Sequence, residues 1–409
     1  MLYCAVGYSL TFYYRTIALH LWSDFFNLKT TYTYIIYEKT SHLPEDWDEL
    51  ARSNIFLSRR YLKILEDAPP QNMKCYYIGV FDPLRLVGIA LSQFLNLNQL
   101  ETFGERDRCF KTSIRNFIFK KFCSHVLFMG NNMLTGQNAF AFEINANKTL
   151  GIQTLFEASL ELKEKLKKAG LPVHLTTYKD FEKDDLTHFP SENFASLYSF
   201  STQPNMVFCS CHEWHNFEDY LNALSKKYRD QYKRCRKKGD GIQKRKLNLE
   251  EINHLEDTIY DLYHHVAQNA PFNTFFLPKN HFRVMKENLK DDFLFYGYFD
   301  NQKLIGFNTL IKNGFQMDTY FLGYNESIQR EKMLYLNMLY DMIAYSINKG
   351  FKEIVFARTA LEIKSSVGAK PQEMFGFIEH SNSFINRKME QLFCYLEPKT
   401  EWKERNPFK

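Results

Sequence analysis

Apolar and polar positions alternate in two stretches of the chain that closely match each other. Tyr76–Leu91 reads YYIGVFDPLRLVGIAL, and Leu294–Leu310 reads LFYGYFDNQKLIGFNTL. In each stretch an apolar run leads into a polar turn, DPLR or DNQK, and a second apolar run follows, which is the pattern of an antiparallel β-hairpin. An offset of 218 residues aligns five identical pairs: Gly79 with Gly297, Phe81 with Phe299, Asp82 with Asp300, Leu86 with Leu304, and Gly88 with Gly306. The chain therefore carries one hairpin twice.

Each hairpin leads to an amphipathic helix that ends at a glycine, and a short apolar strand follows the glycine. The first helix is predicted over 155–169, before Gly170 and the strand VHLTT. The second is predicted over about 331–349, before Gly350 and the strand EIVFA. The order β, β, α, β thus occurs twice, with 38 extra residues between hairpin and helix in the first copy. A repeat this long in two copies indicates duplicated domains and not a solenoid.

The length of 409 residues suits two or three domains. We expect an atypical aromatic segment over 1–37, a first domain over 38–212, a second domain over 213–400 and a tail over 401–409. The first segment holds eleven aromatic and three charged side chains. Because Arg15 and His20 interrupt its apolar run and no basic region precedes it, we favour an extra packed segment over a signal peptide or a membrane span.

The cysteines and the common catalytic motifs narrow the class of protein. Eight cysteines lie along the chain without the spacing of a disulfide framework, which predicts reduced thiols in a cytoplasmic protein without stable membrane insertion. Cys209 and Cys211 lie near His212 and His215, but no second pair with zinc spacing accompanies them, so we expect no metal site. P-loop, GxGxxG, GxSxG and HExxH motifs are absent from the sequence, which disfavours kinases, dehydrogenases, serine hydrolases and zinc proteases.

Positive charge is concentrated in one segment. Residues 226–246 hold eleven Lys or Arg and two Asp, a charge of +9 in a chain whose net charge is +5. Up to Lys238 the segment lies in a predicted amphipathic helix that begins at Asn216 and packs through an apolar stripe, and a GDG break separates this helix from Lys244, Arg245 and Lys246. A solvated helix face is the ordinary interpretation, but the density of one sign favours an anionic partner such as RNA, a nucleotide sugar or acidic lipid. The residues of this basic patch are Lys226, Lys227, Arg229, Lys233, Arg234 and Arg236.

Polar side chains cluster just beyond the predicted strand EIVFA, and loops at strand ends commonly hold ligands. Cations there could bind phosphate or carboxylate, a carboxylate could transfer a proton, and hydroxyls could orient a substrate. The alternative is that Glu362 and Lys364 are solvated positions of a short helix. The candidate binding residues are Arg358, Thr359, Lys364, Ser365 and Lys370, with Glu362 as a candidate base.

The strand QMDTYFLGYN and the helix after it supply further candidates. Asp318 and Tyr320 share one face of that strand, where a carboxylate is costly unless it is paired or belongs to a site. Asp318 is therefore either a general base or the partner of a neighbouring hydroxyl. Asn337 lies with Asp341 and Tyr345 on one face of the helix, which is either a ligand-binding face or solvent-exposed surface.

The duplicated ββαβ arrangement resembles two tandem domains of the GNAT acyltransferase fold. The segments FEDYLNALSKKYRDQYKR, FYGYFDNQKLIGFNTL and VFARTALEIKSSVGAKP resemble the Fem-like branch, which includes aminoacyltransferases that build peptidoglycan bridges. The resemblance spans roughly 40–400 and implies an α+β fold of two mixed, mostly antiparallel sheets flanked by helices. It implies transfer of an acyl or aminoacyl group to an amine, either a small molecule or an envelope precursor.

The resemblance leaves the donor open between acyl-CoA and aminoacyl-tRNA as a co-substrate, with no tightly bound cofactor. The segment that matches the pyrophosphate loop of ordinary GNAT enzymes, 323–335, has one glycine and no QxxGxG pattern, which disfavours acetyl-CoA. By resemblance, Asp318 or Glu362 is the base, Tyr320 or Tyr335 supplies an acid or positioning hydroxyl, and Arg358, Lys364 and Lys370 hold an anion. The alternative is a catalytically degenerate GNAT-fold module that binds RNA or an anionic envelope precursor. The sequence does not define the oligomeric state.

Overall fold

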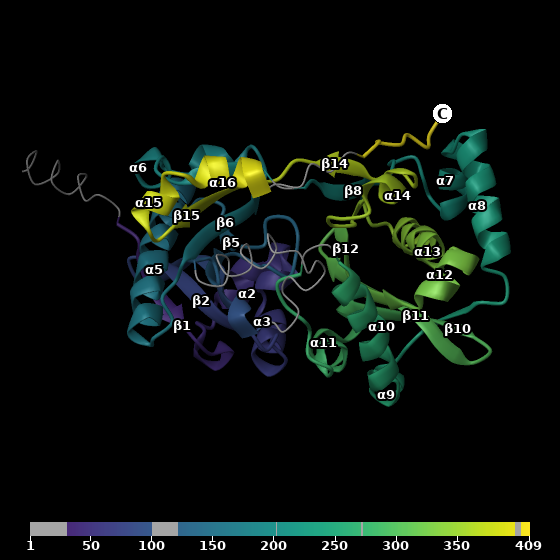
Figure 1. The fold of residues 1–409 in the computed structure, drawn as a ribbon, viewed down its shortest axis with the longest axis horizontal. Helices are drawn as coiled ribbons and strands as arrows, with labels where there is room; N and C mark the ends of the chain where they lie inside the picture. The colour runs from purple at the N-terminus through teal and green to yellow at the C-terminus, as the bar shows by residue number, and fades with distance from the viewer. Residues whose placement is uncertain (1–30, 100–121, 202, 271–272, 397–401) are drawn as a thin grey trace, which may run out of the picture.

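The computed structural model describes residues 31–99, 122–201, 203–270, 273–396 and 402–409. The expected N-terminal aromatic segment lies outside these residues up to residue 30, and its last residues form β1. The described strands form two sheets (Figure 1). The first sheet has the order β1 (Thr33–Tyr37), β2 (Met73–Asp82), β3 (Arg85–Asn96), β4 (His125–Met129), β6 (Leu175–Phe181), β15 (Phe375–His380) and β7 (Tyr198–Ser201), and β5 (Phe140–Phe142) pairs with β3. The second has the order β14 (Lys370–Gln372), β8 (Asn205–Cys209), β13 (Glu353–Val355), β12 (Gln316–Tyr324), β11 (Lys303–Asn313), β10 (Phe293–Asp300) and β9 (Gln243–Lys246).

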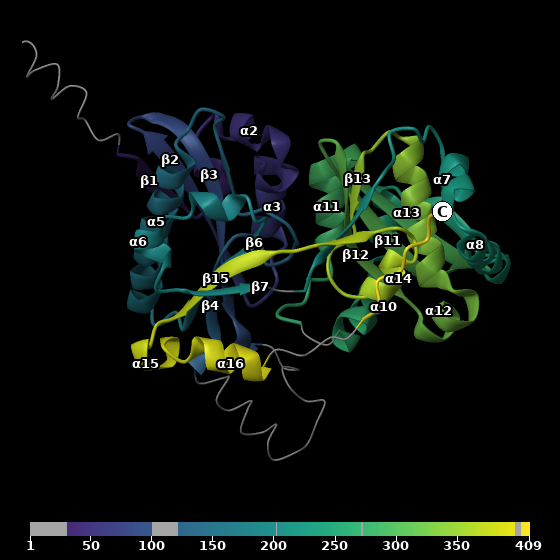
Figure 2. The ribbon, with the colours of Figure 1, turned by 90° about the horizontal axis from the view of Figure 1, so that it is seen from above.

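The helices flank these sheets (Figure 2). Those of the first half are α2 (Trp47–Leu50), α3 (Arg59–Asp67), α5 (Lys148–Lys168) and α6 (Ser191–Phe194). Those of the second half are α7 (Phe217–Ala223), α8 (Lys226–Lys238), α9 (Leu249–His254), α10 (Glu256–Asn269), α11 (His281–Leu289), α12 (Glu326–Lys332), α13 (Leu334–Asn348) and α14 (Leu361–Ser365). The chain then returns to the first sheet with β15, α15 (Ser383–Asn386) and α16 (Met389–Leu396).

The repeated hairpin has the same register in both copies. Gly79 lies opposite Ile89 in β2–β3, and Gly297 lies opposite Phe307 in β10–β11. Both pairings shift at one position, between Val80 and Phe81 in the first copy and between Tyr298 and Phe299 in the second. These positions differ by the same 218 residues that align the sequences, so the repeat extends to a β-bulge.

Both predicted helices end at their glycines. Gly170 and Gly350 have φ values of 78° and 77°, in the left-handed region that glycine adopts without a Cβ clash. The second predicted helix is divided in two, because Met333 between α12 and α13 has a φ of 51°. The strands that follow, β6 and β13, pair in parallel with β4 and β12. All other strand pairs in the described ranges are antiparallel.

The chain exchanges strands between the sheets. β8, at 205–209, lies in the second sheet, and β15, at 375–380, lies in the first sheet between β6 and β7. The division of the sheets therefore differs from the expected boundary between 212 and 213. Hydrophobic patterning locates a strand, but it does not identify the sheet that the strand joins.

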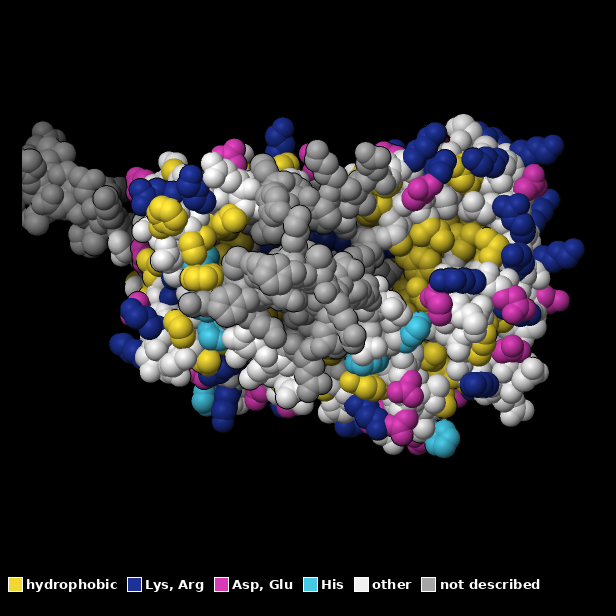
Figure 3. All heavy atoms as spheres, in the orientation of Figure 1, with side chains coloured by type: hydrophobic (Ala, Val, Ile, Leu, Met, Phe, Trp, Pro, Cys, Tyr) yellow, Lys and Arg dark blue, Asp and Glu magenta, His cyan; other side chains and the backbone are white. Residues whose placement is uncertain are grey.

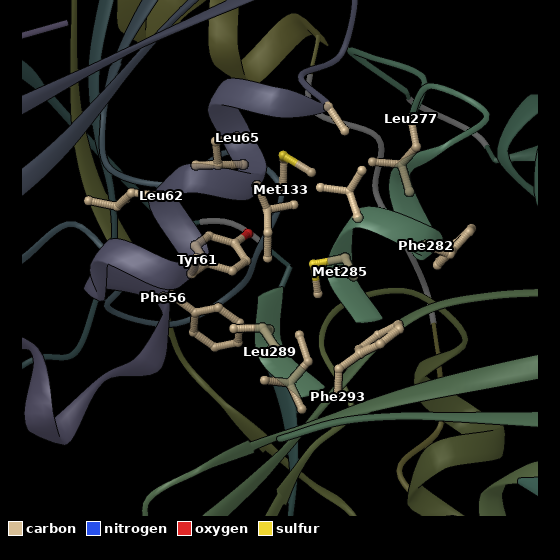
Figure 4. Close-up of a cluster of buried hydrophobic side chains, with 14 of the residues drawn as sticks. Phe56, Tyr61, Leu62, Leu65, Met133, Leu277, Phe282, Met285, Leu289 and Phe293 are labelled. Carbon is tan, nitrogen blue, oxygen red and sulfur yellow. The ribbon is translucent and has the colours of Figure 1, made fainter. Parts of the chain in front are cut away.

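The two halves share one hydrophobic core. Helices α3 and α11 pack together, and buried side chains from both halves form one continuous cluster (Figure 4). Tyr61, Leu62, Met285 and Leu289 are fully buried there. A cluster of this size fixes the orientation of the halves, because separating them would expose it to water.

Candidate functional site

Polar side chains at the carboxyl ends of β6 and β13 contact each other between the two halves. β6 ends with Lys179, Asp180 and Phe181, and β13 is followed by Ala357 and Arg358. The guanidinium of Arg358 pairs with the carboxylate of Asp180 and donates a 3.0 Å hydrogen bond to the carbonyl oxygen of Gln203. The ammonium of Lys179 pairs with the same carboxylate and donates to the carbonyl oxygens of Asn131 and Leu134. We call Lys179, Asp180, Arg358 and Lys364 the junction cluster.

The backbone at this junction is strained on both sides. Asp180 has a φ of 68°, and Ala357, Thr359 and Ala360 have φ values of 58°, 68° and 48°. None of these residues is glycine, so each left-handed conformation costs on the order of 1–3 kcal/mol. Such strain persists only where the surrounding structure enforces it, and it concentrates at functional sites.

Lys364 holds the strained loop in place. This side chain is 4% exposed, and its ammonium donates hydrogen bonds of 3.1 and 2.6 Å to the carbonyl oxygens of Ala357 and Arg358. Burial lowers the pKa of Lys364 to about 7 and that of Arg358 to about 10. Burial, together with the nearby charge of Arg358, lowers the pKa of Lys179 well below its ordinary value.

The junction cluster thus contains three basic side chains and one carboxylate, and burial favours the neutral forms of Lys179 and Lys364. Removing a cation from water is unfavourable unless an opposite charge or hydrogen-bond acceptors replace the water. Asp180 pairs with Lys179 and Arg358, whereas the ammonium of Lys364 bonds carbonyl oxygens. An anionic group of a ligand bound here would favour the charged forms of the two lysines.

Asp318 lies on β12, opposite Val355 of β13. Its carboxylate is 6% exposed and accepts a 3.1 Å hydrogen bond from the side-chain amide of Asn313. The amide oxygen of Asn313 accepts a 2.9 Å bond from the backbone N–H of Ile55 in the other half. Burial raises the pKa of Asp318 from 3.8 to about 7, and the bond from Asn313 offsets part of the rise. A carboxylate with this pKa can exchange a proton near neutral pH.

Tyr320 belongs to a hydrogen-bonded chain that joins the halves. Nδ1 of His281 lies 3.1 Å from the carbonyl oxygen of Ala68, so this nitrogen donates, and Nε2 accepts from the hydroxyl of Tyr320 at 2.9 Å. Burial lowers the pKa of His281 to about 4, which keeps the ring neutral. A hydrogen bond also joins the hydroxyls of Tyr320 and Tyr61, and the Tyr61 hydroxyl accepts a 3.3 Å bond from the side-chain amide of Asn131. The chain fixes the position of the Tyr320 hydroxyl.

Glu362 and Ser365 contact the C-terminal tail. The Glu362 carboxylate pairs with the guanidinium of Arg405, with Nε at 2.9 Å. The Ser365 hydroxyl donates to the carbonyl oxygen of Glu362 and accepts a 3.0 Å bond from the backbone N–H of Arg405. Glu362 is nevertheless half-exposed, with 49% of its side chain accessible.

The remaining predicted site residues lie apart from the junction cluster. Asn337 is buried and bonds the guanidinium of Arg236 at 3.0 Å and the carbonyl oxygen of Cys235 at 3.1 Å, so it anchors the end of α8. Tyr335 is half-buried on α13. Thr359 is exposed in the strained loop, and Lys370 is exposed on β14, where its backbone pairs with Val207.

A family model described as peptidoglycan biosynthesis and recognition, FemAB-like, matches residues 140–397, more than half of the chain. The chain belongs to the FemAB-like family. The FemX crystal structure matches it with a TM-score of 0.51 and 12% identity, over 86% of this chain and 98% of that chain. A tandem GNAT protein from the clavulanic acid biosynthesis pathway gives 0.47 and 8%, over 86% and 99%. L-PGS from Bacillus licheniformis gives 0.43 and 9%, over 84% and 98%. No curated protein sequence matches.

The family and the two mixed sheets confirm the predicted fold class, an α+β protein of two tandem GNAT-like domains. The segment predicted to match the pyrophosphate loop of GNAT enzymes, 323–335, covers the end of β12, Asn325, α12 and the start of α13. There the side chain of Asn325 accepts bonds from the backbone N–H groups of Ser327 and Ile328, at 3.1 and 3.3 Å. Because Asn325 already occupies these N–H groups, they are not free to bind an anion at the start of α12.

In this FemAB-like protein the residues of the predicted basic patch fall into an exposed set and an inward-facing set. Lys226, Lys227, Lys233 and Arg234 are exposed on the solvent face of α8. Arg236 turns inward to the carboxylate of Asp341 at 2.7 Å, and Arg229 bonds the carbonyl oxygen of Leu224.

Two structural features are absent from the described residues. Among them, no group of three or more His, Cys, Asp or Glu side chains is arranged to hold a metal ion. Within the same ranges, no helix combines the length and the apolar character that a membrane crossing requires.

Sequence reasoning missed Lys179, Asp180, Tyr61 and His281. The repeat itself contained a signal for the first two. VHLTTYKD ends the first copy with a lysine and an aspartate, at the place where Arg358 ends the second. Tyr61 and His281 gave no signal, because a buried phenol or imidazole on a helix resembles any other core residue in sequence.

Proposed function

We propose that this FemAB-like protein transfers an acyl or aminoacyl group to the amine of a peptidoglycan precursor, and that the junction cluster holds an anionic group of a substrate. The family description supports the pathway. The observation that carries the proposal is the grouping of three basic side chains around one carboxylate at a strained junction between the halves. Phosphate or carboxylate groups on the precursor are the anions that the basic side chains of this cluster would bind.

In the proposed reaction, the amine nitrogen of the acceptor attacks the acyl carbon of the donor. The new bond is the amide C–N bond, and the bond that breaks joins the acyl carbon to an ester oxygen of aminoacyl-tRNA or to the sulfur of acyl-CoA. The proton lost by the amine passes to a base and then to the leaving oxygen or sulfur. Asp318 is the favoured base because its pKa lies near neutrality. Glu362 is the alternative, although Arg405 already engages it. Tyr320 would position the reacting groups.

Between the two donors, the geometry favours aminoacyl-tRNA over acyl-CoA. The first N–H groups of α12 already bond Asn325, so they are poorly suited to a pyrophosphate. The same observation favours the second candidate function, a degenerate module that binds an anionic ligand without turnover. Transfer to an amine in the presence of either donor would exclude that second function.

The test supplies the purified protein with an envelope precursor and one donor at a time, and mass spectrometry of the acceptor detects transfer. Arg358→Gln and Lys179→Met should each lower kcat/KM by about 10- to 100-fold, since a hydrogen bond to a charged group contributes about 1.5–3 kcal/mol. The matched control, Lys352→Ala, removes an exposed lysine near the same strand and should leave the rate unchanged. Equal rates in all variants would contradict the anion-binding role of the junction cluster.

A further inference from the structure

The solvent face of α8 is almost uniformly cationic. Seven of its positions are exposed, and six of them carry a positive charge: Lys226, Lys227, Lys233, Arg234, Lys237 and Lys238, with Asp230 as the exception. No ion pair within the described residues involves any of these six. On a helix of 13 residues, they form a strip about 20 Å long. Self-repulsion along such a strip is unfavourable without an anionic partner.

Polar contacts on the inner side of α8 hold this helix so that its cationic side chains point outward. The carboxylate of Asp341 binds the guanidinium of Arg236 at 2.7 Å and the hydroxyl of Tyr298 at 3.0 Å. Asn337 bonds the carbonyl oxygen of Cys235, and its amide lies only 2.7 Å from where a Cβ on Gly239 would be. The helix is thus fixed by its inward arginine, and the basic face plays no part in docking it.

The position of α8 favours a flat partner. The helix lies at the outer edge of the second half, far from the first half in both ribbon views (Figures 1 and 2). Basic side chains project from this edge, and a hydrophobic surface over the α12–α13 region adjoins them (Figure 3). Half-buried apolar side chains of that region include Ile328, Met333 and Tyr335. A cationic edge beside apolar surface matches the headgroup and acyl boundary of an anionic bilayer.

The same residues fit RNA less well. Aromatic side chains that stack on bases are a common feature of RNA-binding surfaces. The two tyrosines of α8 are turned inward: Tyr228 is buried, and Tyr232 packs against Tyr340 at 5.0 Å. The outward charges are mostly lysines, which act as flexible point charges, whereas Arg229 and Arg236 are used inside the protein.

We propose that the solvent face of α8 docks the protein onto an anionic phospholipid surface. This role goes beyond the transfer activity and does not depend on it. Each lysine near such a surface contributes about a fivefold increase in partition, which corresponds to about 1 kcal/mol. Docking would therefore be reversible and strongly dependent on ionic strength.

The experiment is co-sedimentation of the full-length protein with vesicles of phosphatidylcholine alone or with added phosphatidylglycerol, at low and at moderate salt. The wild type should bind only the anionic vesicles, and less at moderate salt. The double variant Lys233→Gln and Lys237→Gln should bind about 25-fold more weakly. The matched control replaces Lys148 and Lys168, two exposed lysines of α5, and should bind like the wild type.

Circular dichroism and thermal unfolding establish that each variant is folded. A parallel titration with total tRNA distinguishes the other anionic partner. Equal vesicle binding by the wild type and the α8 variant would overturn the proposal. It would also be overturned if the α8 substitutions weakened tRNA binding while vesicles failed to bind the wild type.

Discussion

Asp318→Asn should stabilise the protein, and the gain should grow with pH. Burial raises the pKa of Asp318 from 3.8 to about 7, a difference of about three units. At 1.36 kcal/mol per unit, ionising this carboxyl destabilises the folded state by about 4 kcal/mol. Below pH 3.8 the group is protonated in both states. Between pH 3.8 and about 7 the unfolded chain loses the proton first, so the free energy of unfolding falls as pH rises, and above this window the loss stays constant.

The asparagine variant removes this titration while it keeps the shape of the side chain. Its amide oxygen can still accept the bond from Asn313 that now measures 3.1 Å. Relative to the wild type, the variant should therefore gain about 3 kcal/mol more at pH 8 than at pH 5. If Asp318 is also the base, the same variant should lose turnover while it gains stability.

Urea unfolding followed by circular dichroism at pH 5 and pH 8 measures the difference. Asp261→Asn, which changes an exposed carboxylate on α10, is the control and should show a much smaller dependence on pH. If the Asp318→Asn effect is the same at both pH values, the carboxyl does not titrate in this window. The reasoning from burial would then be refuted.

Further substitutions test the packing. Met285→Ala should lower the free energy of unfolding by about 2–5 kcal/mol while a single transition is retained, since Met285 is fully buried in the core that both halves share; two separate transitions would contradict one shared core. Gly170→Ala and Gly350→Ala should each cost about 1 kcal/mol from backbone strain alone, because no atom lies within 4 Å of either added Cβ, and a neutral result would dispute the left-handed caps. Gly368→Ala should cost more, since its Cβ would lie 2.6 Å from the ring of Phe408, and adding Phe408→Ala should recover part of the loss; simple additivity in a double-mutant cycle would argue against that contact.

The sequence predicted those features that depend on local pattern. The hairpin repeat, its constant offset, and the glycines that end both helices reflect spacing and backbone preference, which neighbouring residues determine. The exchange of β8 and β15 between the sheets was not predictable, because strand pairing is a long-range property that patterning does not encode. Likewise, the break at Met333 runs against its helical preference and is imposed by packing.

The candidate site was predictable only in part. Arg358 is predicted to hold an anion, but the carboxylate with which it pairs, that of Asp180, lies 178 residues away in sequence. Asn337 and Asp341 share a face, as their spacing requires, yet this face packs against α8 instead of facing solvent. Helical spacing defines which residues lie together, whereas the element that covers them comes from the tertiary fold.

The junction cluster is tested most directly by measuring transfer to an envelope precursor with wild-type protein, Arg358→Gln and Lys352→Ala side by side. We predict transfer by the wild type and the Lys352 control, and a kcat/KM about 10- to 100-fold lower for Arg358→Gln with the protein still folded. Transfer at the wild-type rate by Arg358→Gln would contradict an anion-binding junction. Absence of transfer by the folded wild type with either donor would contradict the proposed activity itself.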